Sequence, residues 1–70
     1  MEKQQVSSST LLSVGYDSDT QILEVEFING NVYEYKNVPQ IVYENLMSAP
    51  SCGSYFSREI SKAYSYSKIE

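Results

Sequence analysis

Residues 21–36 read QILEVEFINGNVYEYK, and most of the architecture can be inferred from this stretch. Its first half alternates apolar residues with glutamates, in the order Leu23, Glu24, Val25, Glu26 and Phe27. Alternation with a period of two indicates a strand with one buried face. The glutamates oppose burial of the other face, because an unpaired carboxylate resists removal from water. We therefore expect a strand whose odd-numbered residues point toward the core.

The Asn-Gly pair within 28–30 predicts a hairpin, and the hydrophobic pattern selects the length of its loop. A two-residue loop would place Glu34 opposite Val25, on the core face. A three-residue loop, 28–30, places Tyr33 opposite Val25 and turns Tyr35 inward as well. A type I turn followed by glycine in the left-handed conformation closes such a loop. We expect the longer loop, because a slip of one residue would turn both tyrosines to solvent.

The segment before this hairpin predicts a third strand. Leu12, Val14 and Tyr16 alternate with small residues, which indicates that these three side chains share one face. Residues 17–20, Asp-Ser-Asp-Thr, predict a turn, because such side chains bond to nearby backbone groups. Residues 1–9 are polar, and residues 65–70 alternate only weakly. We expect both ends to be frayed, although 65–70 leaves open a short added strand.

Two helices are predicted to follow the strands. Pro39 suits the first position of a helix, and Pro50 ends it because the residue before a proline is driven out of the helical conformation. Between the prolines, apolar residues recur at helical spacing, at Val42, Tyr43, Leu46 and Met47. A second helix, capped by Ser51 or Ser54, is indicated by the stripe Phe56, Ile60, Ala63 and Tyr64.

The order of three strands and then two helices predicts an α+β fold, a three-stranded antiparallel meander with two short helices packed on one face. We expect residues 1–70 to form a single domain that is ordered over about 7–64. The structural core expected from these patterns consists of Tyr16, Leu23, Val25, Phe27, Tyr33, Tyr35, Leu46, Phe56 and Ile60.

Composition restricts the functions that the chain can have. The net charge is −4 and only five Lys or Arg residues are present, which opposes strong non-specific binding to nucleic acid and to anionic membranes. With one cysteine and no histidine, the chain cannot form an internal disulfide or a Cys/His zinc site, and Cys52 lacks a histidine base. No apolar run approaches the ~20 residues of a membrane span, and a signal-peptide core is absent from the N-terminus. We expect a cytoplasmic, non-catalytic protein without metal or cofactor.

Several segments in their order resemble the KTSC domain family, over roughly residues 7–64. They are Val14-Gly15-Tyr16-Asp17, residues 23–27, Gly30, Tyr33-Glu34-Tyr35, Val38-Pro39, residues 49–56 and Ile60. Pro50 departs from the pattern, where a small residue other than proline is expected. The family is named for the C-terminal extension of some lysyl-tRNA synthetases and also occurs as small stand-alone bacterial proteins. It has no established activity, and the resemblance implies an RNA- or tRNA-associated role only by this association.

One segment has the chemistry of an anion or RNA site. Ser51, Gly53 and Ser54 are expected to present backbone N–H groups at the start of a helix, and Arg58 adds charge one turn later. The competing interpretation is ordinary helix capping by serine.

A second candidate is a protein-binding surface on the sheet face away from the helices. Its expected residues are Ile22, Glu24, Glu26, Ile28, Val32 and Glu34, with Lys36 beside them. Its carboxylates repel phosphate, so a protein partner suits it better than RNA; a plain solvated face is the alternative. Tyr33 and Tyr35 are expected under the helices, where their rings are withheld from base stacking.

Overall fold

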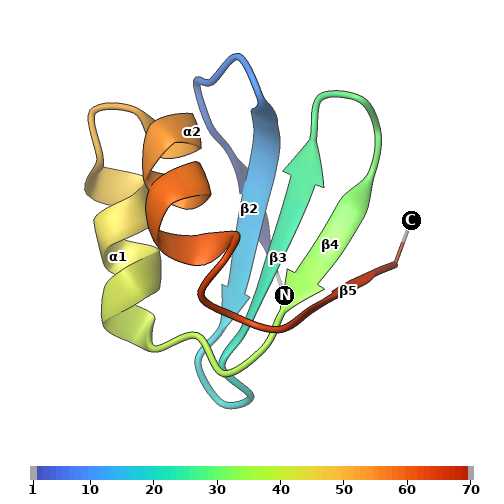
Figure 1. The fold of residues 1–70 in the computed structure, drawn as a ribbon, viewed down its shortest axis with the longest axis vertical. Coiled ribbons are helices and arrows are strands. Elements are labelled where there is room, and N and C mark those ends of the chain that lie inside the picture. The colour runs from blue at the N-terminus through green and yellow to red at the C-terminus, as the bar shows by residue number, and fades with distance from the viewer. Residues whose placement is uncertain (1, 70) are drawn as a thin grey trace.

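The computed structural model describes residues 2–69 and shows one antiparallel sheet with helices on one of its faces (Figure 1). Five strands form the sheet in the order β1-β2-β3-β4-β5. The strands are β1 (Lys3–Gln5), β2 (Leu11–Asp17), β3 (Ile22–Phe27), β4 (Val32–Tyr35) and β5 (Tyr66–Lys68). The helices are α1 (Gln40–Ser48), α2 (Cys52–Tyr55) and the π-helix η1 (Phe56–Ile60), which continues α2.

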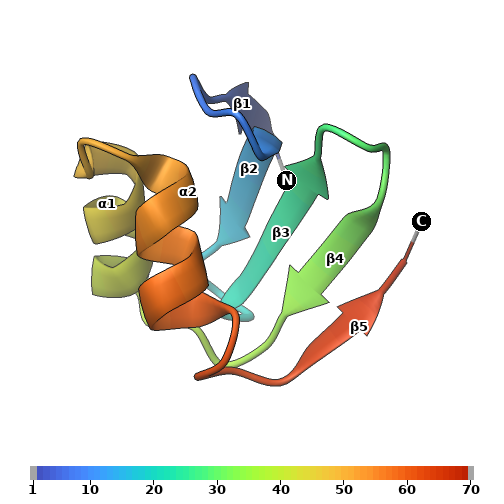
Figure 2. The same ribbon diagram turned by 45° about the horizontal axis from the view of Figure 1, so that its top comes forward.

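The prediction of an α+β fold with an antiparallel sheet and two short helices is confirmed, but the predicted number of three strands is wrong. Both ends of the chain, which we expected to be frayed, add an edge strand (Figure 2). On the β5 side, the N–H of Lys36 donates to the carbonyl of Ser65 at 2.9 Å, and that of Ile69 donates to the carbonyl of Val32 at 2.8 Å. An edge strand of three residues is held by its neighbour's backbone, so its own sequence carries little signal.

The pairing of β3 with β4 follows the three-residue loop. Val25 lies opposite Tyr33 and Leu23 lies opposite Tyr35, as predicted. Gly30 has a φ of 95°, and its N–H donates to the carbonyl of Phe27 at 2.9 Å. The turn therefore uses glycine where a residue with a Cβ would be strained.

The predicted alternation of β2 is wrong at its first residue. Leu12 was expected on the core face, but it is 42% exposed and Leu11 is fully buried instead. The cause is a shift in register between Leu11 and Ser13, where β2 bulges against β3. A bulge adds one residue to a strand, so the side-chain alternation before it is reversed.

The helices cover the side of the sheet that carries the apolar residues. Leu46 of α1 and Phe56 and Ile60 of η1 are buried against the strands. Pro39 immediately precedes α1 with an extended backbone, rather than occupying its first turn as predicted. Buried residues of the core cluster are Leu11, Val14, Leu23, Val25, Tyr35, Val38, Leu46, Phe56 and Ile60, and the partly buried residues against it include Tyr16, Phe27 and Tyr33.

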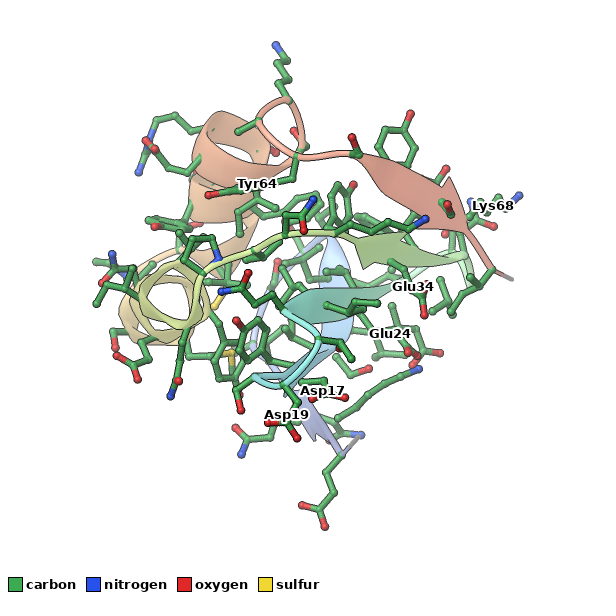
Figure 3. The ribbon with its side chains drawn as sticks, turned by 90° about the horizontal axis from the view of Figure 1, so that it is seen from below. Asp17, Asp19, Glu24, Glu34, Tyr64 and Lys68 are labelled. Atoms are coloured by element: carbon green, nitrogen blue, oxygen red, sulfur yellow. The ribbon has the colours of Figure 1, made fainter. Side chains whose placement is uncertain are left out.

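Hydrogen bonds and ring stacking stabilise the end of the sheet where β2 turns into β3. The Tyr16 hydroxyl donates to the carbonyl of Val38, and its ring stacks on Tyr43 with centroids 5.0 Å apart. In the turn that follows β2, a carboxylate oxygen of Asp17 accepts from the N–H of Asp19 at 3.0 Å (Figure 3). The turn predicted for residues 17–20 therefore forms through the expected side-chain chemistry.

Tyr35 makes the stability of the fold sensitive to alkaline pH. Its side chain is 3% exposed, and burial, followed by the neighbouring Tyr66 and Tyr33, raises the pKa of its phenol from 10.0 to about 12. The unfolded chain releases this proton near pH 10.0, whereas the folded chain keeps it up to about pH 12. The stability that the folded state gains from the protonated Tyr35 phenol is therefore complete below pH 10 and is lost as the pH rises toward 12. We expect the free energy of unfolding to fall by up to about 1.4 kcal/mol per pH unit across this range.

Urea unfolding at a series of alkaline pH values measures this slope. Tyr35→Phe should reduce the slope of the free energy of unfolding against pH. Tyr55→Phe removes a phenol from outside the cluster of Tyr33, Tyr35 and Tyr66, and should leave this slope unchanged. Burial, and then Asp17, also raise the pKa of Tyr16, so some slope should persist in Tyr35→Phe. Equal slopes for the wild type and Tyr35→Phe would contradict the assignment.

Candidate functional site

A shallow groove of about 610 Å³ brings the segment 51–58 against the loop that precedes β2. All four residues of the predicted anion site line it, so the structure does bring them together. The complete lining is Ser7, Ser8, Ser9, Thr10, Pro50, Ser51, Gly53, Ser54, Ser57 and Arg58. Seven of these ten residues carry a hydroxyl group, one is a cation and none is a carboxylate.

Gly53 sets how closely the two walls of the groove approach. A Cβ at this position would lie 3.1 Å from the Ser8 hydroxyl oxygen and 3.7 Å from that of Thr10. The Ser8 oxygen is itself held in place, because it accepts from the N–H of Thr10 at 3.1 Å and from that of Leu11 at 3.2 Å. The glycine therefore lets α2 approach a loop that lies more than forty residues earlier in the chain.

Ser51 caps α2, as the alternative interpretation of this segment, ordinary helix capping by serine, predicts. Its hydroxyl oxygen accepts from the N–H of Ser54 at 3.3 Å, so that N–H is taken by the cap. With only four α-helical residues, α2 has a weak dipole, and its N-terminus by itself is not an anion site. A serine oxygen that accepts still has its own hydroxyl proton to donate, and Ser8 and Ser51 both keep this ability.

Arg58 supplies the positive charge of the groove. Its side chain is exposed, and its Nε lies 3.4 Å from a carboxylate oxygen of the adjacent Glu59, which is exposed as well. An exposed pair at this distance contributes little energy, because water and salt screen it. The guanidinium group is therefore able to exchange this neighbour for a phosphate, with which it forms paired hydrogen bonds.

The proposed protein-binding face of the sheet is less open than expected. Glu24 forms an ion pair with Lys3 of β1 at 2.8 Å, and Glu26 accepts from the Ser13 hydroxyl at 3.0 Å. Val32, expected in contact with solvent, is 4% exposed, and its carbonyl accepts from the N–H of Ile69 at 2.8 Å. Figure 3 shows Glu24 and Glu34 on the side of the sheet away from the helices.

The remaining residues of this face differ in their exposure. Ile22 and Glu34 are half-buried, and Lys36 is exposed. Ile28, at the end of the hairpin, is 54% exposed. These residues do not form one continuous apolar area, since carboxylates separate them.

Sequence reasoning missed half of the groove. Residues 7–9 were assigned to a polar, frayed end and Thr10 was given no role, so the convergence of residues 7–10 on Gly53 was not foreseen. The run of three serines was the available signal, but a polar run before a strand is also typical of an ordinary loop. Tyr66 was missed as well, because its strand was not expected.

Within residues 2–69, no cluster of three or more His, Cys, Asp or Glu side chains has the arrangement of a metal site. The Cys52 thiol is half-buried and donates to the carbonyl of Leu46 at 3.4 Å, which is a structural contact. In the same part of the chain, no helix combines the length and apolar character needed to cross a bilayer.

These features define a class of small α+β domain, in which an antiparallel meander carries two short helices on one face and an open, hydroxyl-rich groove at their junction. The chain belongs to the KTSC domain family, whose model matches residues 7–64. The crystal structure of a KTSC domain protein from Yersinia pestis has a TM-score of 0.93 and 41% identity, and the match covers 99% of this chain and 97% of that one.

Two kinds of curated relative accompany this structural match. A protein of Stutzerimonas stutzeri called an uncharacterized protein is 41% identical over 71 residues, the full length of both chains. A lysine–tRNA ligase of Trichormus variabilis is 46% identical over 54 residues, which cover 77% of this chain but 10% of the ligase. A ligase of Nostoc punctiforme is 38% identical over 61 residues, 11% of its length. The family thus occurs both alone and as a small part of a tRNA ligase.

The close approach at Gly53 predicts an unusual response to substitution. Alanine is about 1 kcal/mol more favourable than glycine within a helix. At this position the new methyl group would displace the Ser8 oxygen, which two backbone N–H groups hold. We expect Gly53→Ala to leave the free energy of unfolding unchanged or to lower it.

Urea unfolding gives the free energy, and the amide shifts of Thr10 and Leu11 report on the Ser8 contacts. Ser54→Ala, at the next and exposed position, is the control and should gain a few tenths of a kcal/mol from helix propensity. If Gly53→Ala raises the free energy of unfolding by about 1 kcal/mol and leaves these amide shifts unchanged, the contact between α2 and Ser8 does not require glycine at this position.

Proposed function

We propose that this domain is a non-catalytic RNA-binding module that holds the sugar–phosphate backbone in the groove between residues 7–10 and 50–58. The observation that carries this proposal is the lining of the groove, which combines hydroxyl groups with Arg58 and contains no carboxylate. Serine and threonine hydroxyls, together with arginine, are the usual contacts to phosphate and sugar oxygens. Such contacts position a nucleic acid without reading its sequence.

The distribution of charge makes this proposal compatible with a net charge of −4. The strand carboxylates Glu24, Glu26 and Glu34 lie on the face of the sheet away from the helices, whereas the groove lies at the helices. Exposed charges separated by more than about 8–10 Å are largely screened at physiological ionic strength. The carboxylates therefore weaken the attraction of RNA without abolishing it, and we infer modest, salt-sensitive affinity.

We further infer that tRNA is the natural RNA. The support is the occurrence of related segments in lysine–tRNA ligases, at 46% and 38% identity. A weak, sequence-independent contact to backbone suits an accessory module, because the ligase itself has to supply the discrimination between tRNAs.

The second candidate is a protein-interaction module that uses the sheet face with Ile22, Ile28 and Glu34. The exposure of Ile28 favours it. It is the weaker proposal, because Val32 is buried and Glu24 is engaged by Lys3. Amide shifts on this face in the presence of a protein partner, with none at the groove, would favour it over RNA.

Substitution of Arg58 tests the proposal. Titration of tRNA and of a short single-stranded RNA across a salt series should give an affinity that falls as salt rises. Arg58→Gln removes one phosphate contact, so we expect several-fold weaker binding and a salt slope that is smaller by about 0.7–0.9. Amide shifts on RNA addition should be largest within residues 7–10 and 51–58.

Lys36→Gln is the matched control. It makes the same change in net charge, but its residue is exposed on the opposite side of the sheet. The groove assignment is wrong if Lys36→Gln weakens binding as much as Arg58→Gln does. The proposed function itself fails if the wild-type chain shows no binding at high micromolar RNA.

A further inference from the structure

Four aromatic rings form a row that runs from the core to the surface of the sheet. Phe56 meets Phe27 edge to face at 5.6 Å, and Phe27 meets Tyr33 in the same way at 5.4 Å. Tyr33 then stacks on Tyr66, with centroids 5.4 Å apart and an interplanar angle of 18°. Exposure increases along the row, from the buried Phe56 to Tyr66, which is 55% exposed.

The structure holds the last ring of this row in a defined place. Tyr66 lies opposite Tyr35 in the pairing of β4 with β5, and their centroids are 5.4 Å apart. The backbone bonds from Lys36 to Ser65 and from Ile69 to Val32 fix the strand on both sides of it. Tyr33 therefore covers one face of the Tyr66 ring, while the residue as a whole stays 55% exposed. A fixed ring with one free face is a stacking platform.

Charge favours an anionic ligand on this side of the sheet. Lys68 lies opposite Tyr33 and two residues after Tyr66, so the alternation of the strand places it on the same face as both rings. The paired strand residues that share this face include no carboxylate; they are Gln4, Leu11, Val14, Tyr16, Leu23, Val25, Phe27, Tyr33, Tyr35, Tyr66 and Lys68. Glu24, Glu26 and Glu34 all belong to the opposite face.

A second hollow connects the groove with the aromatic row. It has a volume of about 290 Å³ and is lined by Ser9, Thr10, Phe27, Ile28 and Asn29. Ser9 and Thr10 also line the groove, and Phe27 is a member of the row. The groove and the second hollow are therefore neighbours, and Phe27 joins the hollow to Tyr33 of the row. Because the longest extent of the domain is 28 Å, this surface has room for only a few nucleotides.

We propose that Tyr66 stacks on an unpaired base of single-stranded RNA, with Tyr33 as its support and Lys68 in contact with a neighbouring phosphate. This inference rests on the proposed function and adds the kind of RNA that is bound, one with unstacked bases. Every base has a π-face, so the contact tolerates any sequence but requires an accessible base. A fully paired duplex offers none, whereas the loops and the 3′ end of a folded RNA do.

The experiment compares hexauridylate, hexaadenylate and an abasic oligonucleotide of the same length. Binding is followed by tyrosine fluorescence and by amide shifts at Tyr33, Tyr66 and Lys68. We expect both hexanucleotides to bind the wild type more tightly than the abasic oligonucleotide. Tyr66→Phe keeps the ring and should retain binding, whereas Tyr66→Leu keeps bulk without the flat face and should lose about 5- to 100-fold. Urea unfolding of each variant verifies that β5 and the fold persist.

The possible outcomes separate this inference from the proposed function. If Tyr66→Leu binds as the wild type does while Arg58→Gln is weakened, the platform is overturned and the groove stands. If the wild type binds no RNA, both proposals fail. If Tyr66→Leu changes only self-association in sedimentation, then β5 is a contact between copies of the chain, and the platform is likewise overturned. Equal affinity for the abasic oligonucleotide would also overturn it.

Discussion

The pairing in which Val25 faces Tyr33 and Leu23 faces Tyr35 determines the arrangement of everything else in this domain. A strand has a side-chain period of two, so this register assigns Leu23, Val25 and Phe27 of β3 and both tyrosines of β4 to one face, and every glutamate to the other. A slip of one residue in β4 would move Glu34 beneath the helices and turn both tyrosines of that strand into water. The Asn-Gly turn with Gly30 in the left-handed region is what holds the register in place.

The same register separates the charges of an acidic protein. The side of the sheet away from the helices carries the strand carboxylates, and ion pairing with Lys3 and hydrogen bonding to Ser13 satisfy two of them. The side with the helices carries aromatic rings, hydroxyl groups and the cations Arg58 and Lys68. The net charge of the whole chain therefore differs from the charge on each face of the sheet. It is a poor guide to the kind of ligand that either face binds.

The sequence predicted the parts of the fold in which local pattern and burial agree. The alternation of residues 23–27 with that of 32–35 left one acceptable register, and the structure has it. The edge strands were missed because three residues such as Lys3–Gln5 gain order from a neighbour's free backbone, not from their own side chains. The bulge at Leu11 was missed because two adjacent leucines suit either phase of the alternation. The groove was predicted only in half, since its other wall depends on a contact between Gly53 and Ser8 that no local pattern encodes.

The structure shows that a tyrosine of this sheet can belong to the core and also support a binding surface. From the sequence, Tyr33 and Tyr35 belong beneath the helices and are withheld from any ligand. Tyr35 is indeed buried, but Tyr33 is half-buried and stacks on the exposed Tyr66. Tyr33 packs against the core and also stacks on Tyr66, so the ordered core restricts the motion of the exposed ring as well. An exposed aromatic ring on such a support loses less conformational entropy on binding than one on a loop, which makes a small core sufficient to build a binding surface.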